Sequence, residues 1–172
     1  MVNRKVCAAH NCEASTVGKS KYCRQHRMEA RQKWLEKVSK QNEDRDNRYS
    51  QFAELAKKAD AAGKEAAEAR IPIPMVVESH KNQLDDSSPV EQSWYVPQGV
   101  CGFAWITIRP GNCSFAHWAV KNLNAKKAYG GGVQMWISDY GQCMEKKSAY
   151  ASTYAKVLKD AGIKAYSGSR MD

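Results

Sequence analysis

Three cysteines and a histidine are concentrated in the first 26 residues, in the pattern Cys7-x4-Cys12-x10-Cys23-x2-His26. Thiolate and imidazole groups are the ligands that Zn²⁺ prefers, and four of them complete its tetrahedral shell. The x2 spacing places Cys23 and His26 one turn apart, so the start of a helix can present both to one ion. The sequence therefore predicts one zinc ion held by Cys7, Cys12, Cys23 and His26.

The identity of the fourth ligand and the role of the ion rest on the neighbouring residues. His10 is a rival ligand, but His26 completes a pair with Cys23 and precedes a helix-forming segment. Three local cysteines are too few for an iron–sulfur cluster, and Glu13 is the only acid near enough to assist a catalytic zinc. A structural ion that folds a segment with almost no core is expected. Free thiols on a basic tail are the alternative.

The net charge of +9 is unevenly distributed. Residues 1–34 carry eight Lys or Arg against two acids, and residues 99–172 carry ten against four, whereas residues 35–70 are neutral and residues 71–98 are acidic. Two basic ends predict two surfaces that attract polyanions, of which nucleic acid is the first candidate. At the N-terminal end the residues expected to contact phosphates are Arg4, Lys5, Lys19, Lys21, Arg24 and Arg27.

Residues 27–70 form a helical linker in this interpretation, because they lack proline and contain a single glycine, Gly63. A weak apolar stripe runs along this segment, interrupted by Asn42 and Arg45. A connecting helix is the preferred interpretation; a dimerising helix, giving a homodimer through residues 27–70, and two shorter helices are the alternatives. The stripe consists of Leu35, Val38, Tyr49, Phe52, Ala56 and Ala59.

Residues 71–98 are expected to be an extended segment and a loop. Pro72 and Pro74 force an extended backbone over residues 71–77, and residues 79–93 have the composition of a loop.

Residues 99–172 are expected to fold as a small α/β layer (β-α-β-α-β), which makes the chain an α+β protein overall. Strands are expected at 100–108, 133–137 and 163–166, and helices after Ser114 and over 142–160. The first strand is apolar on both alternating faces, which predicts a central strand covered on both sides. Two sets of side chains are assigned here: Trp105, Trp118 and Trp136 to the core, and Lys126, Lys127, Tyr129, Tyr140, Lys146 and Lys147 to nucleic-acid binding.

Two resemblances accompany these patterns. The Cys-x4-Cys…Cys-x2-His segment resembles the zinc knuckles of phage-type HNH endonucleases and related treble-clef proteins over about 26 residues. It departs from the nucleases because no His-Asn-His core follows. Residues 71–172 resemble a family of uncharacterised proteins of tailed bacteriophages, which implies a phage origin and no known activity. The stretches that carry this second likeness are residues 73–77, 101–105, 139–142 and 168–172, with Phe115, Trp118, Lys147 and residues 149–151.

The expected function is therefore that of a zinc-containing, phage-type protein that binds DNA or RNA without catalysis. A protein-interaction module, such as a host-factor inhibitor or an assembly subunit, is the alternative. A nuclease ranks third, because the C-terminal carboxylates (Asp139, Glu145, Asp160 and Asp172) are scattered. The N-terminus lacks the apolar core of a signal peptide, so the cytoplasm, of the host cell if phage-encoded, is the expected compartment.

Overall fold

The computed structural model describes residues 5–16 and 19–172 and divides the chain into two compact units. The first unit is Met1–Tyr49 and the second is Ser50–Asp172. Among the described residues, no helix is long and apolar enough to cross a membrane.

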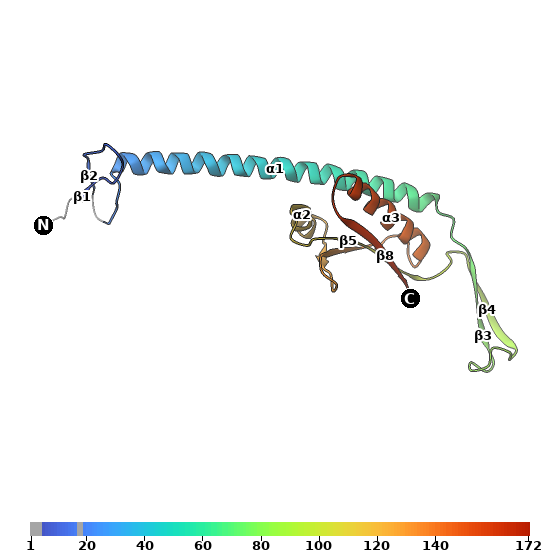
Figure 1. Ribbon diagram of the computed structural model, residues 1–172. Helices are drawn as coiled ribbons and strands as arrows, with labels where there is room; N and C mark the ends of the chain where they lie inside the picture. The colour runs from blue at the N-terminus through green and yellow to red at the C-terminus, as the bar shows by residue number, and fades with distance from the viewer. Residues whose placement is uncertain (1–4, 17–18) are drawn as a thin grey trace. The chain divides into compact units, whose positions relative to one another are not determined.

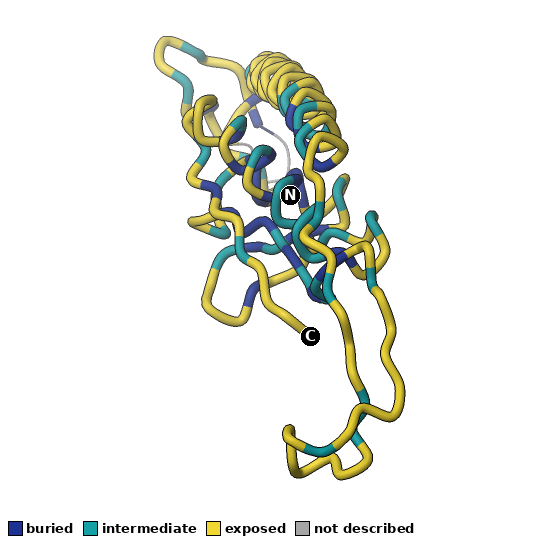
Figure 2. The backbone as a smooth tube through the Cα atoms, turned by 90° about the vertical axis from the view of Figure 1, so that its right-hand side faces the viewer, coloured by how far each residue is buried: buried dark blue, intermediate teal, exposed yellow. Residues whose placement is uncertain are grey.

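Helix α1, Arg24–Ala69, is one continuous helix of 46 residues. The alternative of two shorter helices is therefore wrong, because Gly63 does not interrupt the run of strong helix formers on either side of it. The part of α1 in the first unit is exposed at nearly every position, including Trp34 and Leu35 (Figure 2). The expected apolar stripe is buried only from Ala56 onward, in the second unit.

The second half of α1 packs against the C-terminal part of the chain through small side chains. Ala56, Ala59, Gly63 and Ala67 are buried, and a Cβ at Gly63 would lie 2.8 Å from a ring carbon of Tyr150. This close approach requires glycine, because any side chain would displace the tyrosine ring. Residues 50–69 are thus part of the second unit's core as well as a connection.

Helices α2, Ser114–Asn122, and α3, Met144–Asp160, cover one face of a sheet (Figure 1). The sheet has the strand order β6-β7-β5-β8, and each neighbouring pair is antiparallel. The element order β-α-β-β-α-β is the split β-α-β arrangement of ferredoxin-like domains. The strands are β5, Gly102–Ile108; β6, Lys126–Lys127; β7, Val133–Trp136; and β8, Ala165–Met171.

The expectation of mixed helix and sheet behind a long helix is confirmed, but three details of the expected layer are corrected. Strand β6 was missed, because two lysines carry no strand signal. The N-cap of α2 is Cys113 and not Ser114, since the Cys113 sulfur accepts a hydrogen bond from the backbone N–H of Ala116 at 3.4 Å. The last strand continues to Met171, well beyond the expected end at Tyr166.

The core of the second unit lies between the sheet and its helices. Ala104, Ile106 and Ile108 of β5 are fully or almost fully buried, as is Leu158 of α3. The opposite face of β5 is not covered in the same way: Phe103 and Trp105 are half-buried. The prediction of a strand covered on both sides is therefore wrong, because aromatic side chains on an uncovered face produced the same apolar run as a second layer would.

Residues 75–96 form a β-hairpin where a loop was expected over 79–93. Strands β3, Met75–His80, and β4, Val90–Val96, pair in antiparallel register, with Val77 opposite Trp94. Most of their residues are exposed (Figure 2). The loop interpretation failed because neither face of the hairpin is buried, so the sequence shows no alternation of apolar and polar residues.

Candidate metal centre and basic surfaces

Cys7 and Cys12 are positioned by a small hairpin at the start of the described chain. Strand β1, Lys5–Val6, pairs with β2, Ser15–Thr16, and Cys7 follows β1 directly. The backbone N–H of Cys7 donates to the Ala14 carbonyl at 3.0 Å, which closes the loop that carries Cys12. Asn11 has a φ of 57°, a left-handed conformation that asparagine tolerates better than most residues, and it turns the chain just before Cys12.

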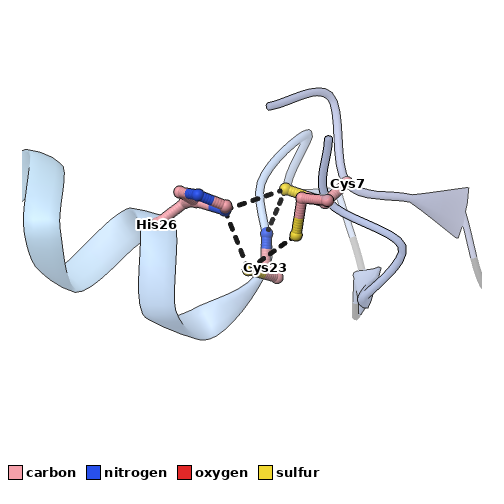
Figure 3. A group of neighbouring side chains, drawn as sticks. Cys7, Cys23 and His26 are labelled. Atoms are coloured by element: carbon pink, nitrogen blue, oxygen red, sulfur yellow. Dashed lines mark hydrogen bonds between the residues drawn. The ribbon is translucent and has the colours of Figure 1, made fainter. Parts of the chain in front are cut away.

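Cys23 and His26 are positioned by the start of α1. Cys23 immediately precedes the helix, His26 lies in its first turn, and the N–H of Arg27 donates to the Cys23 carbonyl at 3.1 Å. Figure 3 shows the side chains of Cys7, Cys23 and His26 directed toward one another from the loop and from the helix. The x2 spacing therefore places this pair one turn apart.

The ligand atoms of Cys7, Cys12, Cys23 and His26 all lie within 4.8 Å of one another. We call these four residues the Cys3His cluster. The Sγ atoms of Cys12 and Cys23 are 3.9 Å apart, and His26 Nδ1 lies 3.5 Å from Cys7 Sγ and 3.3 Å from Cys23 Sγ. In a tetrahedral zinc site the bond lengths require about 3.8 Å between two sulfurs and about 3.5 Å between sulfur and nitrogen. The four side chains are close enough to hold a metal ion, and their separations match that geometry.

The electrostatics of the cluster favour deprotonated sulfur at two of the three cysteines. Burial raises the pKa of Cys7, but hydrogen bonds from the Cys23 and Ala9 N–H groups and from His26 outweigh it and lower the pKa to about 6. The backbone N–H of His26 lowers the pKa of Cys23, and hydrogen bonds to Cys7 and Cys23 raise the pKa of His26.

Cys12 differs from the other two thiols. The Ala14 N–H lowers its pKa, but burial and the neighbouring sulfurs of Cys7 and Cys23 raise it above the ordinary value. Like charges crowded together disfavour a third thiolate, and a bound cation would remove this penalty. The cluster thus has the charge balance of a cation site.

Two further residues near the cluster clarify the ligand set. His10, the rival ligand, is exposed and does not belong to the group of converging atoms. Thr16 is 1% exposed, and its Oγ1 donates to the Lys5 carbonyl at 3.1 Å, which ties β2 to β1. The sequence gave no signal for Thr16, because a threonine in a polar stretch is usually solvated.

The cations expected to contact phosphates lie in the exposed part of this region. Arg4 lies outside the described residues. The other five are exposed, and none of them forms an ion pair with another residue that the structure describes. They are Lys5, Lys19, Lys21, Arg24 and Arg27.

The second set of expected binding residues is divided between two places in the second unit. Lys126 and Lys127 form β6 and are exposed, and Tyr129 in the following turn is fully exposed. Tyr140 is half-buried, with its ring centre 6.1 Å from that of Tyr150, and Lys146 is half-buried on α3.

Lys147 requires a correction, because it is not a surface residue. It is 5% exposed, and its ammonium group donates to the Gly102 carbonyl at 3.1 Å. The hydrogen bond ties α3 to the start of β5, so Lys147 stabilises the fold and is not available to a phosphate. Trp136 requires the opposite correction: it was assigned to the core and is 53% exposed, whereas Trp118 is buried as expected.

No family model, curated protein or solved structure matches this chain.

Proposed function

We propose that this chain is a zinc-containing, non-catalytic nucleic-acid-binding protein of phage type. The observation that carries the proposal is the convergence of four sulfur and nitrogen ligand atoms within 4.8 Å, surrounded by exposed cations. A tetrahedral set of three sulfurs and one imidazole suits zinc better than the oxygen-seeking Mg²⁺ or Ca²⁺.

The proposed role of the ion is structural. All four coordination positions are supplied by the protein, which leaves none open for a substrate or an activated water. The nearby acid, Glu13, is exposed and is not among the converging groups. The ion would fix the hairpin of Cys7 and Cys12 against the start of α1 and so supply the folding energy of residues 5–26.

The nucleic-acid part of the proposal rests on the five exposed cations around the cluster. A metal-fixed segment holds them at constant separations, and each one that neutralises a phosphate releases counterions on binding. Because phosphate contacts carry no sequence information, this surface accounts for affinity and not for specificity.

The test is the salt dependence of binding, measured by fluorescence anisotropy with a labelled duplex of about 20 base pairs from about 50 to about 200 mM salt. Lys19→Glu with Lys21→Glu removes two of the cations. The matched control is Lys37→Glu with Lys40→Glu, which makes the same charge change at exposed positions of α1 in the same unit.

The double change at 19 and 21 is expected to reduce the slope of log K against log salt by about 1.8, which corresponds to two phosphate contacts. The control is expected to retain the slope of the unaltered protein. Binding without salt dependence, or equal losses in both variants, would contradict the proposal.

A protein-interaction module remains the second candidate, because α1 exposes large apolar side chains in the first unit. Met28 is 60% exposed and Trp34 is 61% exposed, and Leu35 is also exposed. Aromatic and apolar residues of this kind anchor protein interfaces. Recovery of a host protein in stoichiometric amount, without nucleic acid, would favour this candidate over the first.

A further inference from the structure

The sheet of the second unit has one face that the helices do not cover, and aromatic side chains from three strands share it. Side chains alternate between the two faces of a strand, so those next to the buried Ala104, Ile106 and Ile108 point away from the helices. The strand register then assigns the positions of the neighbouring strands to the same side. We call this the open face; it comprises Phe103, Trp105 and Thr107 of β5, Gln134 and Trp136 of β7, Tyr166, Gly168 and Arg170 of β8, and Lys126 of β6.

The aromatic rings of the open face lie close enough to form one surface. Trp105 is directly opposite Trp136, with ring centres 5.0 Å apart, and the Phe103 ring lies 6.0 Å from that of Trp136. Trp136 is 53% exposed and Tyr166 is 49% exposed. These are large apolar surfaces that remain accessible to a ligand.

A glycine on the edge strand makes room for the central tryptophan. Gly168 is opposite Trp105, and a Cβ at that position would lie 2.6 Å from the indole Nε1. The indole of Trp105 therefore lies directly against the backbone of β8. Any other residue at position 168 would push the ring out of this arrangement, so the aromatic surface depends on Gly168.

Cations lie beside these rings. The Arg170 guanidinium is 5.7 Å from the centre of the Phe103 ring, and Lys159 Nζ is 5.1 Å from that of Tyr166. Lys126 is exposed and pairs with Gln134, whose side chain donates to Thr107 at 3.2 Å. None of the described strand positions on the open face carries a carboxylate.

We propose that the open face binds single-stranded nucleic acid, an inference that rests on the proposed nucleic-acid-binding function and names the form of ligand. Unpaired bases would stack on Trp136, Trp105 and Tyr166, while Arg170 and Lys126 would neutralise phosphates. Every base offers a π-face, and stacking on aromatic side chains beside a cationic groove is how proteins bind single strands. Four-stranded sheets that recognise RNA stack two or three bases on aromatic residues of the sheet.

The charge of the open face selects this ligand over the alternatives. A duplex keeps its bases stacked inside, so it could use the cations but not the rings. A protein partner would leave several lysine and arginine charges to be paired, and lysine is depleted at protein interfaces. A polyanion with exposed aromatic faces satisfies both the rings and the cations.

The experiment compares the affinity of the full-length, metal-loaded protein for a labelled oligo-dT and oligo-U of about ten nucleotides and for a duplex. The test variants are Trp136→Ala and Tyr166→Ala, whose side chains are exposed and whose loss leaves the buried face intact. The matched controls are Trp94→Ala and Tyr95→Ala, exposed residues of the same types on the hairpin strand β4.

Each test variant is expected to weaken single-strand binding about five- to 150-fold and to leave duplex binding unchanged, because only unpaired bases reach the rings. Trp136→Phe is expected to restore most of the affinity, since it keeps a ring for stacking. Quenching of tryptophan fluorescence by the single strand should nevertheless fall in that variant. Preference between oligo-dT and oligo-U would assign the ligand to DNA or RNA.

The other outcomes separate the failure of this inference from that of the proposed function. Unchanged single-strand affinity in both test variants, with a loss in Lys19→Glu and Lys21→Glu, would overturn the stacking face and leave the proposed function intact. Equal losses for single strand and duplex would also overturn it, and capture of a protein that depends on Trp136 while strand affinity is unchanged would assign the face to a protein partner. An unaltered protein that binds no nucleic acid would overturn both.

Discussion

The Cys3His region and the sheet domain are organised in opposite ways. In residues 5–16 and 19–23 the buried residues are Cys7, Thr16 and Cys23, so this segment has almost no core. In the second unit, Ile106, Ile108 and Leu158 are completely or almost completely enclosed by residues far away in the sequence. The comparison suggests that the first region depends on an ion for its order, whereas the second depends on packing.

Removing a ligand should break this comparison most strongly. Cys23→Ser is expected to abolish metal binding and to unfold residues 5–26, because a segment without a core cannot stay folded without its ion. Residues 99–172 should be unaffected. Hydrogen exchange resolved along the chain measures both regions in one experiment.

The control for that variant is Cys113→Ser, which changes a cysteine of the second unit that caps α2. Serine is a good N-cap, so this variant should retain its metal and its stability. Rapid exchange in residues 99–172 of Cys23→Ser would contradict the independence of the two regions.

A core substitution should have the complementary effect. Leu158→Ala removes a fully buried side chain of α3 and is expected to lower the free energy of unfolding of the second unit by about 2–5 kcal/mol. The metal content should not change. Urea denaturation followed by circular dichroism, together with metal analysis, measures both; loss of metal in this variant would show that the two regions are coupled.

Lys147→Met sharpens the comparison within the second unit, where a residue expected to bind nucleic acid is buried. Removing its hydrogen bond to the Gly102 carbonyl is expected to cost about 1–3 kcal/mol of stability, because that carbonyl is left without this donor. Affinity for the duplex should be unchanged. A weaker affinity with unaltered stability would return Lys147 to the binding surface.

The smallest expected effect concerns pH and the end of α1. The N–H of Ile73, and then the Arg70 guanidinium at 2.8 Å, lower the pKa of Glu145. A carboxyl whose pKa is lower in the folded state stabilises the fold above its unfolded pKa and loses that contribution as pH falls through the folded pKa.

Glu145→Gln should therefore destabilise the second unit at about pH 7 and have less effect at about pH 3, where the carboxyl is protonated in the unaltered protein. The difference between the two proteins in urea midpoint, taken at each pH, isolates Glu145 from the other carboxylates. A difference that grows toward low pH has the wrong sign for this account.

The sequence was informative where chemistry depends on neighbours in the chain. The spacing of Cys7, Cys12, Cys23 and His26 selected the four residues whose ligand atoms converge, because both pairs lie on short local elements. The helices around Trp118 and Leu158 were also predictable, since their buried residues repeat at helical intervals.

Properties that depend on strand pairing could not be read in the same way. An apolar run such as residues 100–108 does not show whether its second face meets a layer or solvent, so Trp136 was assigned to the core. Lys147 lies on an amphipathic helix among other lysines, and its burial follows from the position of Gly102, a residue 45 positions earlier.

The measurement that tests the central claim most directly is metal analysis of the full-length protein purified without chelator, combined with X-ray absorption at the zinc edge. The account predicts one zinc per chain, with three sulfur ligands at about 2.3 Å and one nitrogen at about 2.0 Å, and no zinc in Cys23→Ser. A chain that retains no zinc, or a Cys23→Ser variant that binds it as fully as the unaltered protein, would contradict the claim that these four residues form a metal centre.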